Sequence, residues 1–153
     1  GKMLWPMEIV GRAGRSKSHI WGDDDPRAYL GLAAPEFPNF FMMYGPNTNL
    51  GHGGSAVFLA ECQMRFIAGV LRAMVERDLD TVEIRRDVHD AYNEDIDARL
   101  KTLVWSHPAV TTWYKNAGGR IITNQPWRLV DYWRLTHDPD LREFVVEATE
   151  KAG

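Results

Sequence analysis

Residues 40–55 read FFMMYGPNTNLGHGGS, and this stretch decides the fold that the sequence predicts. Its first five residues are continuously apolar and are bounded by a proline and a glycine, which is the pattern of a strand buried on both faces of a sheet. The polar, glycine-rich remainder predicts a turn. From Ser55 to about Arg77, apolar residues recur at helical spacing, so a long and largely buried helix should follow the turn.

The segments on either side predict a chain of mixed helices and strands. Glycines, prolines and a run of three aspartates near the start indicate a hairpin and then an extended loop that wraps around the surface rather than packs. Residues 1–39 should form a hairpin and a wrapping loop. Residues 40–105 should form a strand, a helix, a second strand (81–86) and a half-exposed amphipathic helix. Residues 106–153 should form an irregular loop whose tail is a surface helix. The predicted class is α/β, or α+β for this piece on its own.

Composition narrows the class of partner. The chain has 153 residues with 18 basic and 21 acidic side chains. The basic residues do not cluster into a stripe along the sequence. Binding to a phosphate backbone requires such a stripe of basic side chains, so we expect no nucleic-acid partner. The single cysteine, Cys62, cannot form an internal disulfide, which fits a reducing cytoplasm. Charged residues interrupt the longest apolar stretch, residues 56–75, before it reaches membrane-spanning length, so no membrane partner is expected.

The glycine-rich turn is the segment with the strongest chemical signal. Its glycines would let backbone approach a ligand closely, and the N-terminus of the next helix favours an electron-rich or anionic group such as a phosphate or a flavin carbonyl. Two other interpretations remain open. Ser55 could simply cap the helix, or residues 51–56 could be the G-x-G-x-x-A of a complete dinucleotide-binding unit, although no acidic residue at a strand end follows about 20 residues on.

Other candidate residues give weaker signals. The five histidines lack the paired spacing of a zinc site, so no metal ligands are predicted. His89 should lie on a solvated helix face and is given no role. The loop around Trp113 and Tyr114 places aromatic rings in a flexible segment that could close over a ligand. The alternative is that these two rings only cover the edge of the core.

Short motifs recur along almost the whole chain. The first set is GRAG (11–14), Trp21, YLG (29–31), FPNFF (37–41), YGPNTNL (44–50) and ECQ (61–63). Their order and spacing resemble the C-terminal third of Baeyer-Villiger monooxygenases. The second set is GHGGS (51–55), VWSHP (104–108), Trp113-Tyr114 and PWR (126–128). This second set resembles the branch of 4-hydroxyacetophenone monooxygenase, which acts on aryl ketones.

The resemblance implies a fold, two cofactors and a set of site residues. In that family two dinucleotide-binding domains hold FAD and NADPH, and the C-terminal part of the chain completes the FAD-binding domain with a strand, a glycine-rich turn and a helix. Residues 40–77 resemble that part, and residues 113–126 resemble a loop that becomes ordered with NADP. The implied cofactor-binding residues are Asn47, Thr48, Asn49, Leu50, Gly51, His52 and Gly53 beside the flavin, and Trp113 beside the nicotinamide cofactor.

By the same resemblance, the complete enzyme inserts one oxygen atom of O2 into a ketone, with an aryl ketone favoured, to give an ester. Both dinucleotide fingerprints and the family's arginine beside the flavin are missing from these 153 residues. No catalytic residue is therefore assigned, and the isolated chain is expected to be inactive. The alternative is a stand-alone binding or assembly module that uses the glycine-rich turn. Because missing strands would cover part of this piece, we expect the isolated chain to expose an apolar face and to self-associate.

Overall fold

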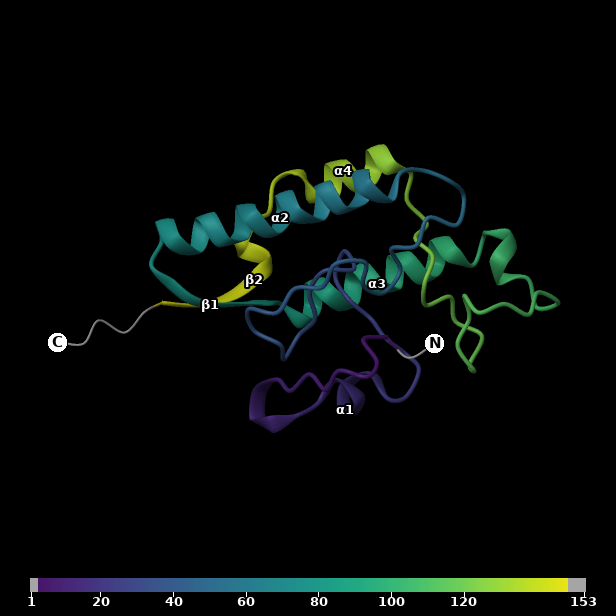
Figure 1. Ribbon diagram of the computed structural model, residues 1–153, viewed down its shortest axis with the longest axis horizontal. Helices are drawn as coiled ribbons and strands as arrows, with labels where there is room; N and C mark the ends of the chain where they lie inside the picture. The colour runs from purple at the N-terminus through teal and green to yellow at the C-terminus, as the bar shows by residue number, and fades with distance from the viewer. Residues whose placement is uncertain (1–2, 149–153) are drawn as a thin grey trace.

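The computed structural model describes residues 3–148, and its helices and short strands enclose a middle layer of irregular backbone (Figure 1). The elements are η1 (Arg12–Gly14), α1 (Lys17–Trp21), α2 (Ala56–Glu76), β1 (Leu79–Ile84), α3 (Arg86–Leu100), η2 (Val104–Ser106), α4 (Leu129–His137), η3 (Leu141–Glu143) and β2 (Phe144–Ala148). Helices α2 and α4 lie side by side on one side of the molecule, and α3 lies across from them. The mixture of helices with an antiparallel strand pair fits the predicted α+β class for this piece.

The long helix after the turn is confirmed, and its burial is less complete than predicted. The Ser55 hydroxyl accepts a hydrogen bond from the Phe58 amide and so caps α2, as the capping interpretation required. One face of α2 enters the core, while four apolar residues on the other face are exposed: Val57, Met64, Leu71 and Val75. Helix α2 is therefore amphipathic rather than buried all round. Within residues 3–148, no helix combines the length and the apolarity needed to cross a bilayer.

The predicted strand over residues 40–44 is wrong. Asn39 and Tyr44 both have positive φ, which turns the chain at each end of this run and prevents continuous extended pairing. Met42 alone in the run is buried, and its amide donates to the Leu32 carbonyl across a loop rather than into a sheet. The apolar run therefore fills space around the core without forming a strand.

The loop predicted to wrap around the surface instead forms the centre of the core. Leu30 and Leu32 are completely buried, and they pack with Phe66 of α2, Val82 of β1 and Phe144 of β2. A tight turn makes this burial possible, because Tyr29 and Ala33 pair as an isolated antiparallel bridge and satisfy their own backbone groups. Prolines and glycines in this segment thus mark a buried turn, which a sequence pattern does not distinguish from a surface loop.

The C-terminal part also differs from the prediction. The segment expected to be irregular contains α4, whose Tyr132 is completely buried and donates through its hydroxyl to the Leu30 carbonyl at 2.6 Å. The predicted tail helix over 138–151 is wrong for its described residues, because residues 144–148 form β2 and pair antiparallel with β1. The β-branched Val145 and Val146 favour that strand.

Two smaller predictions were partly right. The chain near the start reverses through a Val10–Ser16 bridge, as a hairpin would, but α1 then replaces the second strand. Helix α3 is amphipathic as expected, although it ends at Leu100. The prediction of a solvated His89 is wrong, because this side chain is only 7% exposed and its Nδ1 contacts the Asp90 carboxylate at 2.8 Å.

Asn39 closes the free edge of β1. Its side-chain amide donates to the Asp80 carbonyl, while its side-chain oxygen and its backbone amide bond to the backbone of Val82. The positive φ of Asn39 turns this residue so that it substitutes for a pairing strand. The two-stranded sheet therefore has one edge covered by a single asparagine.

Candidate functional site

The glycine-rich turn begins with two residues whose side chains serve the turn itself. Asn47 is 3% exposed and has positive φ, and its side-chain amide donates to the carbonyls of Ile121 and Asn124. The Thr48 hydroxyl donates to the Gly45 carbonyl at 2.7 Å. Both side chains therefore form hydrogen bonds within the protein and fix the shape of the turn. Any ligand would contact the residues that follow them.

The middle of the turn lies against a segment that is far away in the sequence. The Asn49 side chain donates to Asn124 Oδ1 at 2.7 Å, and the same two residues form a parallel bridge. A Cβ on Gly51 would lie 2.6 Å from Asn124 Nδ2 and 2.8 Å from the Trp105 ring. Only glycine fits at this point, since real Cβ atoms do not approach so closely. Asn124 Nδ2 itself is buried without a hydrogen-bond partner.

The end of the turn is open to solvent in front of α2. His52 is exposed, stacks on the Trp105 ring at 5.9 Å between centroids, and places Nε2 3.2 Å from the Trp127 carbonyl oxygen. Gly53 has a φ of 93°, and no atom lies within 4 Å of the position that its Cβ would take. Exposed backbone at the positive end of a helix of 21 residues is suited to an electron-rich group.

Trp113 lies in the same region as the turn, at the far end of a row of rings. It is 65% exposed, and its ring contacts Tyr114 at 4.5 Å. Tyr114 contacts Trp105 edge-on at 6.5 Å, and Trp105 in turn stacks on His52. The structure therefore brings the two predicted parts of the site, about 60 residues apart in the sequence, onto one continuous aromatic surface.

A partly buried cluster of charges is connected to the start of the turn. The Arg120 side chain is 12% exposed and bonds to Asp97 at 3.0 Å and to Asp25 at 3.2 Å. Arg27 bonds to the same two carboxylates, so two positive and two negative groups balance. Burial lowers the pKa of the Arg120 guanidinium, although an arginine keeps its charge in such a setting. Arg120 also donates to Asn47 Oδ1 and thereby reaches the turn.

Sequence reasoning missed several of these residues as members of the site. They are Trp105, Arg120, Asn124 and Trp127. A motif scan emphasises a glycine-rich turn because its residues are consecutive, whereas these four residues contact the turn only after the chain has folded. The one available signal was composition, since aromatic and amide residues are frequent between residues 105 and 127.

The described residues do not support a metal site, a reactive thiol or a catalytic nucleophile. Residues 3–148 contain no group of three or more acidic, histidine or cysteine side chains that could hold a metal ion. Cys62 is buried, and burial raises the pKa of its thiol, which disfavours the reactive thiolate. No side chain in the turn is paired with an acid or base as a nucleophile would be, so no catalytic residue is assigned.

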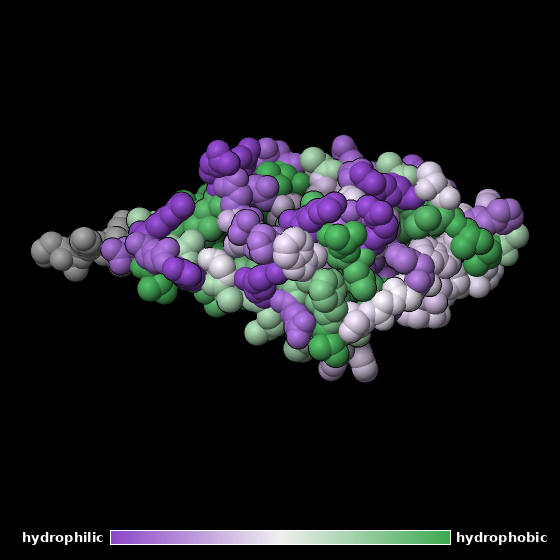
Figure 2. Space-filling view, turned by 90° about the horizontal axis from the view of Figure 1, so that it is seen from above, coloured by the Kyte–Doolittle hydropathy of each residue, from purple (hydrophilic) through white to green (hydrophobic). Residues whose placement is uncertain are grey.

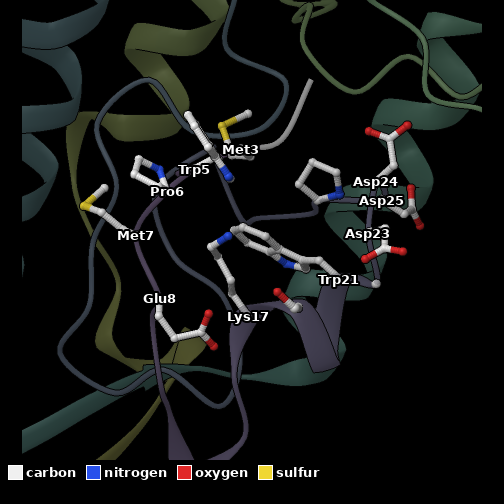
Figure 3. A pocket seen from close by; sticks show the side chains of 13 residues that line it. Met3, Trp5, Pro6, Met7, Glu8, Lys17, Trp21, Asp23, Asp24 and Asp25 are labelled. Carbon is white, nitrogen blue, oxygen red and sulfur yellow. The ribbon is translucent and has the colours of Figure 1, made fainter.

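A separate hollow of about 240 Å³ lies near the start of the chain (Figure 3). Trp21 crosses it, with Trp5 and Met3 on one side and a run of aspartates on another. Lys17 is the one basic residue in the lining, against the acidic Glu8 and the three aspartates, so negative charge dominates the hollow. None of the sequence-predicted site residues lines this hollow, and it is distinct from the surface around the glycine-rich turn.

The contacts of Gly51 lead to a stability prediction. Gly51→Ala should lower the free energy of unfolding by about 1–3 kcal/mol, because its methyl group overlaps Asn124 and Trp105. Gly118→Ala is the matched control, since a Cβ there meets its nearest atom at 3.5 Å, an ordinary contact. Urea unfolding of both variants measures the difference. Equal stability of the two variants would contradict the packing described for the turn.

Comparison with known proteins identifies relatives of nearly the whole chain, although no protein-family model matches it. It is 48% identical over 143 residues to the uncharacterized monooxygenase y4iD of Sinorhizobium fredii, a match to 94% of this chain and 22% of that protein. It is 36% identical over 146 residues to a Baeyer-Villiger monooxygenase of Pseudomonas aeruginosa, a match to 95% of this chain and 27% of that protein. The chain therefore spans about a quarter of the length of these relatives.

A solved structure shares the fold at lower identity. OTEMO in complex with FAD and NADP superposes with a TM-score of 0.78 and 18% identity, over 92% of this chain and 26% of that protein. At this identity the likeness concerns the fold, and the sequence relationship comes from the curated relatives. The chain is homologous to one part of the flavin-dependent monooxygenases of the Baeyer-Villiger type.

Proposed function

We propose that this chain is the C-terminal part of the FAD-binding domain of an NADPH-dependent Baeyer-Villiger monooxygenase. The observation that carries the proposal is the similarity to monooxygenases over 94% of the chain, together with a glycine-rich turn at the start of α2. The complete enzyme would use O2 to convert a ketone into an ester in the cytoplasm. The motifs that resemble the aryl-ketone branch, GHGGS (51–55), VWSHP (104–108) and PWR (126–128), support an aryl ketone as its substrate.

The residues present fit a flavin at the turn. Leu50 and Gly51 are half-buried, while His52 and Gly53 are exposed, and the open space beside Gly53 would allow a planar ring to approach the backbone. The N-terminus of α2 would orient the electron-rich carbonyls of the pyrimidine side by its dipole. When bound, the flavin supplies the redox and oxygen-transfer chemistry. This chain would hold the ring and cover one side of it against water.

Trp113 would contribute at the other end of the aromatic surface. Its exposed indole can stack on a nicotinamide or adenine ring, and its contact with Tyr114 places it on the row of rings that leads to the turn. The loop from 113 to 126 would then help to retain NADP beside the flavin. Asn47, Thr48 and Asn49 would act indirectly, by fixing the shape of the turn.

The alternative is a stand-alone binding or assembly module. One observation favours it: the turn already satisfies its side chains within this chain, through the Asn49–Asn124 and His52–Trp127 contacts. Such a module would use the glycine-rich turn for another ligand, or for none, and would have no oxygenase activity. The two proposals differ in whether this chain is sufficient for binding.

A titration of FAD with the purified chain separates the two proposals. We expect no saturable change in flavin fluorescence in the micromolar range, because one wall of a site cannot repay the entropy of fixing a large cofactor. Riboflavin serves as the control for nonspecific contact with exposed aromatic rings. Saturable binding of FAD at micromolar concentration would favour the stand-alone module and overturn the fragment proposal.

The role of Trp113 is tested in the complete monooxygenase that contains this sequence. Trp113→Ala should weaken NADPH binding about three- to tenfold through loss of aromatic stacking, while Trp113→Phe should keep most of the affinity. Trp5→Ala is the matched control, because Trp5 is also an exposed tryptophan but lies on the separate hollow. Unchanged NADPH affinity in Trp113→Ala would remove Trp113 from the site.

The exposed face of α2 supports a further part of the proposal, that another surface covers it. Val57, Met64, Leu71 and Val75 are between 50% and 79% exposed and recur at intervals of seven and four residues along one side of the helix. Figure 2 shows apolar surface interrupting charged surface at several places along this side of the molecule. The relatives are longer than the region that matches this chain. In the complete protein, that additional part would cover the exposed face of α2. In the isolated chain, a second copy would do so.

Light scattering of the isolated chain tests this part. We expect a dimer or larger species, and Leu71→Glu should raise the dissociation constant by about tenfold or more, because it places a charge in the centre of the apolar face. Val104→Glu is the control, since Val104 is also an exposed apolar residue, at 73% against 50% for Leu71, but lies outside α2. A monomer at high concentration for the unmodified chain would contradict self-association.

A further inference from the structure

Three segments near the aromatic surface are joined by backbone hydrogen bonds. On one side of the segment 120–125, the amide of Ile122 donates to the Tyr114 carbonyl, and Lys115 and Ile121 form an antiparallel bridge. On its other side, the amides of Asn47 and Asn49 donate to the carbonyls of Ile122 and Thr123, at 3.0 and 2.8 Å. The segment 120–125 is therefore the middle one, between the segment that follows Trp113 and the glycine-rich turn.

Arg120 begins this middle segment and fixes it in three directions. Its Nε donates to Asp97 of α3, its Nη1 to Asp25 and the Pro26 carbonyl, and its Nη2 to Asn47 at 3.2 Å. All three guanidinium nitrogens are thus engaged, and their partners come from three separate parts of the chain. The planar fork of an arginine holds such an arrangement in one orientation, which a flexible ammonium group does not.

The Asn47 side chain connects Arg120 to the glycine-rich turn. Its side-chain oxygen accepts from Arg120, and its side-chain nitrogen donates to the carbonyls of Ile121 and Asn124, at 2.9 and 3.1 Å. One buried amide therefore joins the arginine to both ends of the middle segment. The positive φ of Asn47, a conformation that asparagine tolerates well, places the amide in this position.

The chain just before Arg120 is packed much less tightly. Hollows of about 310 and 550 Å³ lie beside residues 106–119, and Gly119 has positive φ with no atom within 4 Å of its Cβ position. Trp113 is largely exposed in the same segment. Arg120 and Ile121 line the smaller hollow as well, so the packing tightens gradually, from the exposed Gly119 to the completely buried Ile122.

We propose that Arg120, acting through Asn47, couples the Trp113 segment to the glycine-rich turn, so that the two halves of the candidate site are ordered together. The middle segment links Trp113 to the turn in addition to the row of rings, and Arg120 stabilises the position of that segment. The coupling is a property of this chain alone. It rests on the proposed function only where the turn is said to face a flavin.

Amide hydrogen exchange of the purified chain, followed by mass spectrometry without any cofactor, tests the coupling. Arg120→Met should accelerate exchange by about tenfold or more in peptides that cover 45–50, 112–116 and 120–125 together, while peptides from α2 and β1 keep their protection. Arg120→Lys retains the charge and should restore protection at 120–125 more than at 45–50, because a single ammonium cannot reach both Asp97 and Asn47. Arg128→Met is the control, since the Arg128 side chain is 75% exposed and pairs with Asp131, a near neighbour in the sequence.

Asn47→Gly provides a second variant in case Arg120→Met unfolds the whole chain. Glycine accepts the positive φ at this position, so the change removes only the side-chain link and leaves the Arg120–Asp97 pair intact. Faster exchange at both 112–116 and 120–125 is expected. Unchanged exchange at those peptides in Asn47→Gly, or acceleration confined to 120–125 in Arg120→Met, would overturn the coupling. Neither result bears on whether the complete enzyme binds a flavin.

Discussion

The middle layer of this fold is buried backbone without a regular sheet, and each of its polar groups must find a partner from elsewhere. Side chains supply these partners. The Tyr132 hydroxyl donates to the Leu30 carbonyl, Asn93 reaches the Ala28 carbonyl, and Gln63 is hydrogen-bonded to Tyr132 and to the Tyr44 amide. Helices α2, α3 and α4 are therefore held to the middle layer by specific hydrogen bonds as well as by apolar packing. The positions of the turn and of Trp113 follow from this arrangement.

This constraint explains which parts of the fold the sequence could predict. Helix α2 was recognisable because its periodicity and its Ser55 cap are local properties. The burial of Leu30 and Leu32 was not recognisable, since it depends on Tyr132 and on other residues about 100 positions away. The same holds for residues 40–44, where apolar composition suggested a strand while positive φ at both ends excluded one. Long-range hydrogen bonds to irregular backbone leave no periodic signal.

The candidate site divides in the same way. The glycine-rich turn was identified from consecutive residues, and its openness at Gly53 agrees with the close approach that glycines allow. Asn47 and Thr48 could not be separated from the exposed residues of the turn by sequence, because their burial arises from contacts with residues 121–124 and with Gly45. The sequence offered Arg120 only as a cation at the end of the loop that contains Trp113, since one arginine among many is distinguished only by the carboxylates that surround it after folding.

The asparagine that covers the edge of β1 limits how this protein can extend its small sheet. With Asn39 hydrogen-bonded along β1, an added strand would have to displace it, at the expense of three hydrogen bonds. Among residues 3–148, none donates or accepts a backbone hydrogen bond along the outer edge of β2, and Val145 and Val146 are accessible. Growth of the sheet is thus directed to one side. A neighbouring strand from the same chain or from another would add next to β2, antiparallel or parallel, and the order of any enlarged sheet would keep β1 at its end.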